Sequence, residues 1–169
     1  VLGRYIKERI VYKLKPGVVH LIDGNAKDPE KECKRLGRVI SKKKIDVVFL
    51  GIGENAHIAF NEPPADFKTK ESFIVVELGG ISRKQQFKEG WFSKTNLVPK
   101  KAITMSINQI MKADNIILLA YEKKKAKAVA GSFKGDISPE FPASILRKHR
   151  KSFVYLDKPA ASLLFKCII

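Results

Sequence analysis

The apolar run "IDVVFL" at residues 45–50 constrains the fold more than any other stretch of this sequence. With the "GIG" that follows, it reads as a strand that is apolar on both faces, which is typical of a central parallel strand covered by helices. Such strands belong to folds in which strands and helices alternate, so the periodicity of the remaining apolar residues decides the fold class.

Strand and helix patterns alternate along the rest of the chain. We expect strands at residues 18–23, 45–53, 72–78, 102–106, 115–121 and 152–157. We expect helices at residues 2–14, 28–44, 107–113, 122–133 (closed by Gly131), 142–149 and 158–164, and a short helix or turn at residues 82–92. This alternation predicts a single α/β domain over residues 1–169 with a mostly parallel sheet.

The chain is strongly basic, with 33 lysine and arginine residues against 17 acidic ones and a net charge of +16. Most of the excess is lysine, and only residues 41–44 and 122–127 form runs. Surfaces that read nucleic acids usually combine arginine with aromatic side chains. The charge therefore favours a solvated, lysine-rich surface over nucleic-acid binding, and it also suits an anionic substrate.

Several other function classes find little support in the sequence. No apolar run approaches the length of a transmembrane span, and no secretion signal opens the chain. The two cysteines and the histidines His20, His57 and His149 lack the spacing of metal ligands. We therefore expect a cytoplasmic protein without a membrane segment, a metal ion or a cofactor.

The loop "GIGENAHIAFNEPP" leaves the carboxyl end of the central strand, where ligands bind in folds of this type. Gly51 and Gly53 allow close approaches that a Cβ atom would forbid. His57 changes charge near neutral pH, and Glu62 can fix its tautomer through a hydrogen bond. A histidine oriented by a carboxylate is the minimum apparatus for acid–base chemistry on a hydroxyl or ring oxygen.

Two plainer interpretations of this loop stay open. A dinucleotide-binding motif requires a helix after the glycines, and the two prolines at residues 63–64 argue against such a helix. His57 can also be a structural histidine, although its position at the end of a strand favours a functional role.

The loop, read as "GIGENAHIAFNEP", resembles the signature of the glucosamine-6-phosphate deaminase/isomerase family. Other segments agree with the family in order, namely "HLIDGNA", "DPEKEC", "EGWF", "VPKKAITMSI", "NIILLAYEKKKAKAV", "FPASILRKH" and "VYLDKPAASLL". The resemblance spans roughly residues 3–164 and implies a doubly wound, Rossmann-like α/β fold with helices on both faces of a mostly parallel sheet. It also implies that an amino-sugar 6-phosphate is converted to fructose 6-phosphate and ammonia, through ring opening and aldose–ketose isomerisation.

The resemblance assigns roles to residues of the loop. It makes His57 the acid or base that opens the sugar ring, and Glu62 the carboxylate that orients it. Asn55 departs from the best-known deaminases, which carry an aspartate there. The difference matters because an amide can accept a hydrogen bond but cannot stabilise an imidazolium electrostatically. This departure leaves galactosamine 6-phosphate open as the substrate, and Asn55 can equally be a turn residue.

The resemblance also implies a phosphate-binding lysine in the run at residues 122–127. Lys125 takes this position, just past a strand and at a helix start whose backbone amides add donors. Lys123 or Lys124 takes it if the register slips, and the whole run can also be a solvated charge cluster. Arg83 is a further candidate for anion binding, although the loop around it differs in length between subfamilies.

One part of the family pattern is not found in this sequence. The family begins with a strand, a phosphate loop rich in glycine, serine and threonine, and an Asp-Glu pair whose aspartate removes the C2 proton. We expect the 169 residues to correspond to the C-terminal two-thirds of the family's domain, and to catalyse the isomerisation inefficiently by themselves.

Three functions follow as hypotheses. The first is an enzyme that acts on a small sugar-phosphate substrate and can form a homo-oligomer. The second is a non-catalytic sugar-phosphate sensor, and the third is a basic module that binds nucleic acid. The combination of His57 and Glu62 in an intact loop favours the enzyme.

Overall fold

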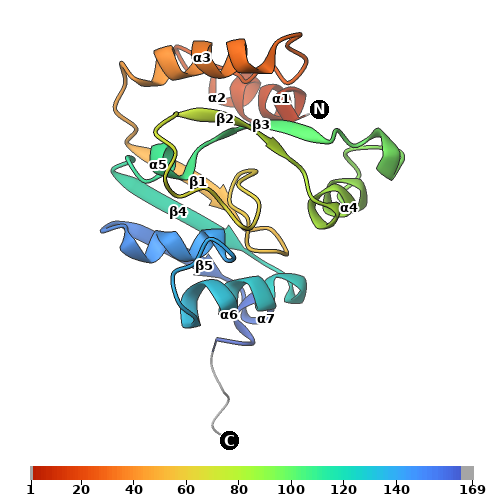
Figure 1. Ribbon diagram of the computed structural model, residues 1–169, viewed down its shortest axis with the longest axis vertical. Helices are drawn as coiled ribbons and strands as arrows, with labels where there is room; N and C mark the ends of the chain where they lie inside the picture. The colour runs from red at the N-terminus through yellow and green to blue at the C-terminus, as the bar shows by residue number, and fades with distance from the viewer. Residues whose placement is uncertain (1, 165–169) are drawn as a thin grey trace, which may run out of the picture.

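The computed structural model describes residues 2–164, in which helices and strands alternate (Figure 1). The strands are β1 (Val47–Gly51), β2 (Phe73–Glu77), β3 (Lys101–Met105), β4 (Asn115–Ala120) and β5 (Ser152–Leu156). The α-helices are α1 (Leu2–Ile6), α2 (Tyr12–Leu14), α3 (Pro29–Ile40), α4 (Gly80–Lys88), α5 (Ile107–Ile110), α6 (Ala126–Lys134) and α7 (Lys158–Ala161). A π-helical segment (Lys7–Val11) joins α1 to α2, and 3₁₀ turns occupy Thr95–Leu97, Lys123–Lys125 and Pro142–Lys148.

The strands form one parallel and one antiparallel unit. In the parallel sheet β4 lies between β1 and β5, so that Ile117 pairs with Phe49 on one side and with Phe153 on the other. Strands β2 and β3 form an antiparallel pair. The prediction of an α/β fold with a mostly parallel sheet is confirmed.

The main hydrophobic core lies against one face of the parallel sheet. Leu50, Ile116 and Leu118 point into it and are between 0% and 8% exposed. Val129 of α6 and Leu146 of the last 3₁₀ turn are fully buried in the same cluster. A smaller cluster lies where α3 packs on β2, at the top of Figure 1.

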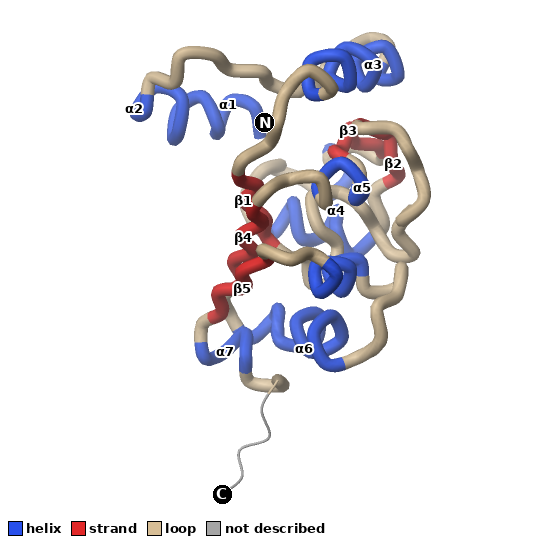
Figure 2. The backbone as a smooth tube through the Cα atoms, turned by 90° about the vertical axis from the view of Figure 1, so that its left-hand side faces the viewer, coloured by secondary structure: helices blue, strands red, loops and turns tan. Residues whose placement is uncertain are grey.

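The opposite face of the parallel sheet is bare in the described part of the chain. Its exposed large side chains range from 42% exposed at Val47 to 69% at Phe49 and include Leu119, Phe153 and Tyr155, whereas Ile117 is partly buried. Figure 2 shows β1, β4 and β5 along one side of the molecule, with α5 and α6 on the other side of them. Parallel sheets are normally covered on both faces, so the described helices supply only one of the two expected layers.

Helix α3 follows directly from its sequence. Asp28 caps it by accepting a hydrogen bond from the Lys31 backbone N–H at 3.0 Å, and Pro29 occupies the first turn, where its missing N–H costs nothing. The helix ends at Ile40, so the lysines at residues 42–44 follow it as a loop. No helix among the described residues is both long and apolar enough to cross a membrane.

Two predicted elements were wrong in detail. Residues 18–23 form no strand, because no neighbouring strand offers them a ladder of hydrogen bonds, and Val18 remains 74% exposed. Helix α6 continues through Gly131 to Lys134 and ends at Gly135. Gly131 lies inside the helix, and a glycine is needed there because a Cβ atom would overlap the ring of Phe141.

The asymmetry of the sheet predicts opposite outcomes for two neighbouring leucines of β4. Leu118→Ala should lower the free energy of unfolding by about 2–5 kcal/mol, because Leu118 is fully buried in the core. Leu119→Ala should cost about 1 kcal/mol or less, because Leu119 on the bare face is 48% exposed. Urea denaturation of both variants measures the difference, and equal costs would contradict the assignment of the two faces.

Candidate active site

The loop after β1 folds back on itself through a tight set of backbone hydrogen bonds. The Gly53 N–H donates to the His57 carbonyl at 2.9 Å, and the Ala56 N–H donates to the Gly53 carbonyl at 3.1 Å. A Cβ atom on Gly53 would overlap the imidazole of His57, whereas a Cβ atom on Gly51 would meet open space. Of the two glycines, Gly53 is therefore the one required by close packing.

The second half of the loop is anchored beside β3. Ile58 is fully buried, and the Phe60 N–H donates to the Thr104 hydroxyl at 3.0 Å. The Asn61 side-chain amide donates to the carbonyls of Ile58 and Met105, both at 2.9 Å. These contacts hold the segment between His57 and Glu62 in one conformation.

A relay of three side chains determines the state of the histidine. His57 Nδ1 lies 2.7 Å from Asn55 Oδ1, and Asn55 Nδ2 donates to Glu62 Oε2 at 2.7 Å. Because an ionised carboxylate only accepts hydrogen bonds, the amide nitrogen of Asn55 faces Glu62 and its oxygen faces the ring. Nδ1 then carries the hydrogen, and the lone pair is on Nε2.

Asn55, and not Glu62, is the residue in direct contact with His57. The Glu62 carboxylate approaches Nδ1 only to 3.8 Å, beyond hydrogen-bonding distance. Its influence on the ring is thus electrostatic and is transmitted through the amide of Asn55. The structure brings all three residues together, but it places Asn55 between His57 and Glu62, which the sequence did not predict.

The ring of His57 is only 7% exposed. Burial lowers its pKa, and the charge of Lys125 acts in the same direction, whereas Glu62 and Glu89 oppose them. His57 is therefore neutral at pH 7, and its unprotonated ring nitrogen can accept a proton.

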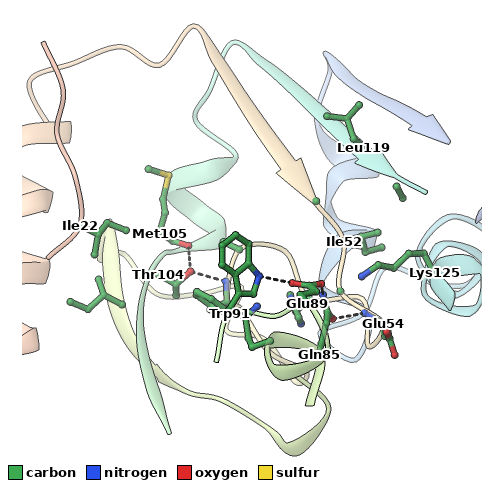
Figure 3. Close-up of a pocket in the computed structure, with 18 of the residues that line it drawn as sticks. Ile22, Ile52, Glu54, Gln85, Glu89, Trp91, Thr104, Met105, Leu119 and Lys125 are labelled. Atoms are coloured by element: carbon green, nitrogen blue, oxygen red, sulfur yellow. Dashed lines mark hydrogen bonds between the residues drawn. The ribbon is translucent and has the colours of Figure 1, made fainter. Parts of the chain in front are cut away.

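His57 lines a cavity of about 1120 Å³ at the carboxyl ends of β1 and β4 (Figure 3). Most of the polar lining comes from three segments: the loop after β1, the region of α4, and the turn after β4; His20, Lys43 and Thr104 lie elsewhere in the chain. From these segments the cavity receives Glu54 and His57, then Gln85, Glu89 and Trp91, and then Glu122, Lys124 and Lys125. Gly51 and Gly53 also border it.

Lys125 is the buried cation of this cavity. It is 8% exposed, and its ammonium group forms no hydrogen bond or ion pair with any residue in the described range. Burial lowers its pKa, and Glu89 and Glu54 partly offset that effect. Lys124, by contrast, pairs with Glu122 at 2.9 Å and is half-exposed. An ammonium that no carboxylate of the described residues pairs with directly is suited to receive an anionic group of a ligand.

Arg83 is not part of the cavity lining. Its Nη2 donates to the Thr95 carbonyl at 3.3 Å, which ties α4 to the 3₁₀ turn that follows it. The geometry thus separates Arg83 from Lys125.

The sequence did not predict the contribution of α4. Glu89 accepts hydrogen bonds from Gln85 Nε2 at 2.7 Å and from Trp91 Nε1 at 3.0 Å, which fixes its carboxylate on the cavity wall (Figure 3). Ser82, also on α4, lies 3.0 Å from His57 Nδ1. The segment "EGWF" marked part of this wall, but nothing in it indicated which cavity it lines.

Together the parallel sheet and the cavity at its carboxyl edge define a Rossmann-like α/β protein with a ligand site at a strand end. The chain belongs to the family of glucosamine-6-phosphate isomerases/6-phosphogluconolactonase, whose sequence model matches residues 4–155. The predicted family is thereby confirmed.

Individual relatives agree with this assignment. The chain is 40% identical to the glucosamine-6-phosphate deaminase of Clostridium acetobutylicum over 147 residues, which cover 86% of this chain and 59% of the relative. It is also 40% identical to the deaminase of Lactococcus lactis subsp. cremoris over 166 residues, 96% of this chain and 68% of the relative. The chain thus spans roughly three-fifths to two-thirds of the relatives that it matches.

Solved structures give the same picture. A monomeric glucosamine-6-phosphate deaminase superimposes with a TM-score of 0.87 at 40% identity, covering 94% of this chain and 66% of that one. A 6-phosphogluconolactonase from Thermotoga maritima superimposes with a TM-score of 0.68 at 17% identity, covering 90% of this chain and 62% of that one. The second similarity concerns the fold alone, and the predicted Rossmann-like fold class is confirmed.

The two loop glycines predict a matched pair of variants. Gly53→Ala should lower the free energy of unfolding by about 1–3 kcal/mol, because the new methyl group displaces the buried ring of His57. Gly51→Ala should change it by about 0.5 kcal/mol or less, because its methyl group meets open space. Thermal or urea unfolding of both variants is the measurement, and equal stability would contradict the close approach at Gly53.

Proposed function

We propose that this chain acts on a hexosamine 6-phosphate, as part of a glucosamine-6-phosphate deaminase/isomerase that releases fructose 6-phosphate and ammonia. The observation that carries the proposal is that a neutral, buried His57 and a buried Lys125 without an ion-pair partner among the described residues line the same cavity. The relatives at 40% identity are named glucosamine-6-phosphate deaminases, which supports the proposal.

In this proposal His57 opens the sugar ring. The lone pair on Nε2 accepts the proton of the anomeric hydroxyl and returns it to the ring oxygen while the bond between C1 and that oxygen breaks. Asn55 holds the Nδ1 hydrogen throughout, so only Nε2 exchanges protons. Glu62 orients Asn55 and favours the protonated ring that forms transiently.

Lys125 binds the phosphate in the same proposal. Its ammonium lacks a partner in the described part of the chain, so a phosphate dianion neutralises a buried charge on entering. Asn55 leaves galactosamine 6-phosphate as the alternative hexosamine. We propose no binding role for Arg83, which lies outside the cavity lining.

The proposal also covers the cellular location and the oligomeric state. A cytoplasmic location suits a sugar-phosphate substrate and the free, buried thiol of Cys33; the other cysteine lies outside the described residues. A homo-oligomer stays a prediction, and the solved deaminase at 40% identity is described as monomeric.

The catalytic role of His57 predicts a loss of turnover that exceeds the loss of binding. In a full-length deaminase that contains this chain, His57→Gln should lower ammonia release from glucosamine 6-phosphate by about 10²–10⁴-fold, while substrate affinity changes little. Because burial lowers the pKa of His57, the wild-type rate should hold as the pH falls to about 6.5 and decline only below it. An enzymatic ammonia assay across pH measures both effects, and equal losses of turnover and affinity would mean that His57 is only structural.

Lys125 predicts the ligand class independently of turnover. Lys125→Met should weaken binding of glucosamine 6-phosphate by about 10- to 100-fold in calorimetry, the loss expected for a charge-assisted hydrogen bond. Lys127→Met is the control, because Lys127 is exposed and does not line the cavity. Tight binding without ammonia release by a full-length protein that contains this chain identifies a sensor. Salt-sensitive binding of nucleic acid in place of the sugar phosphate overturns the proposal.

A further inference from the structure

Ser82 contacts the histidine from an element that no sequence motif connects to it. Its hydroxyl oxygen lies 3.0 Å from His57 Nδ1, and its side chain is only 1% exposed. A second bond joins the same two segments, because the Glu54 N–H donates to Gln85 Oε1 at 3.3 Å. Helix α4 is thus tied to the loop after β1 at two points, one of them on the imidazole itself.

Two oxygen atoms therefore compete for a ring nitrogen that carries one hydrogen at most. Asn55 Oδ1 is at 2.7 Å and is fixed as an acceptor by Glu62, so it requires the hydrogen on Nδ1. A Ser82 hydroxyl that donated to Nδ1 would require a lone pair there, and Asn55 Oδ1 would then face that lone pair at 2.7 Å. Because the contact with Asn55 is the shorter of the two, Nδ1 carries the hydrogen, and the Ser82 hydroxyl oxygen accepts a hydrogen bond from it.

We propose that Ser82 is a positioning residue for His57. Its hydroxyl oxygen shares the Nδ1 hydrogen with Asn55 and holds the imidazole so that Nε2 stays available to the cavity. Ser82 also makes the ring orientation depend on α4, the helix that carries Gln85 and that Glu89 follows directly; both side chains line the cavity. A ligand that contacts this wall thereby acts on the histidine.

The charged groups around the ring set the direction of the expected effect. Burial and Lys125 disfavour the imidazolium, whereas Glu62 and Glu89 favour it. A second oxygen beside the Nδ1 hydrogen also favours the imidazolium, because the hydrogen bond strengthens when the ring is charged. Removing the Ser82 hydroxyl should therefore lower the pKa of His57 further.

Nuclear magnetic resonance of the histidine ring nitrogens tests the proposal on the 169-residue chain without any ligand. His57→Gln identifies the His57 signals among those of His20 and His149. The wild type should carry its hydrogen on Nδ1. Ser82→Ala should keep this tautomer, because Asn55 remains, but its protonated fraction at mildly acidic pH should fall about two- to fivefold, the factor of one neutral hydrogen bond. Ser82→Thr retains a hydroxyl and should restore the wild-type titration.

Three results overturn the proposal. The first is a wild-type ring with its hydrogen on Nε2, which requires no variant and so remains decisive if Ser82→Ala fails to fold. The second is an unchanged titration in Ser82→Ala. The third is an equal shift in the alanine and threonine variants, which would indicate packing and not the hydroxyl.

The consequence for turnover rests on the proposed function. Ser82→Ala should lower the kcat of ammonia release with little change in KM, and Ser82→Thr should restore it. If neither the wild type nor any variant releases ammonia in a full-length deaminase that contains this chain, while the ring titrations behave as expected, the proposed function fails and the role of Ser82 stands. If turnover depends on His57 while the titrations do not depend on Ser82, the role of Ser82 fails and the proposed function stands.

Discussion

The hydrogen bond between Asn55 and His57 decides what chemistry the cavity can support, because it selects the ring nitrogen that stays free. An amide can donate to Glu62 and accept from the imidazole at the same time. An aspartate at position 55 would place two carboxylates in contact, which raises the cost of ionising both. The amide keeps the charge of Glu62 at 3.8 Å from the ring, where burial outweighs it and His57 stays neutral.

The relay is useful only because the parallel ladder between β1 and β4 brings two distant segments to one edge. The register pairs Gly51 with Leu119, so the loop that leaves β1 and the turn that leaves β4 begin at the same level. His57 and Lys125 therefore meet in one cavity although neither is near the other in sequence. A slip of this register would separate His57 from Lys125 without changing either side chain.

The local sequence pattern was sufficient to predict those elements whose residues are themselves typical of a strand, a helix cap or a binding loop. The apolar run of β1, the cap of α3 and the loop with His57, Asn55 and Glu62 could all be read directly. Residues 18–23 had the composition of a strand, but a strand needs a partner, and composition does not supply one. Ser82 and Glu89 were beyond prediction for a similar reason, since their roles arise from the packing of α4 against a loop far away in the sequence.

The turn that delivers Lys125 into the cavity concentrates two energetic costs at one place. Glu122 adopts φ 75° and ψ 146°, a region that is almost restricted to glycine and costs about 1–3 kcal/mol. Its N–H donates to Asp157 Oδ2 and its carbonyl accepts from the Lys125 N–H, both at 3.0 Å, so the ends of β4 and β5 hold the strained residue in place. Burying the ammonium of Lys125 adds a desolvation cost next to it. Strain and a desolvated charge persist only where the surrounding structure holds them in place. Here the fully buried side chains of Ile116 and Leu118 anchor β4, from which the turn leaves. The strain at Glu122 and the desolvated charge of Lys125 at one cavity wall support, independently of any relative, the proposal that the turn after β4 binds an anionic ligand.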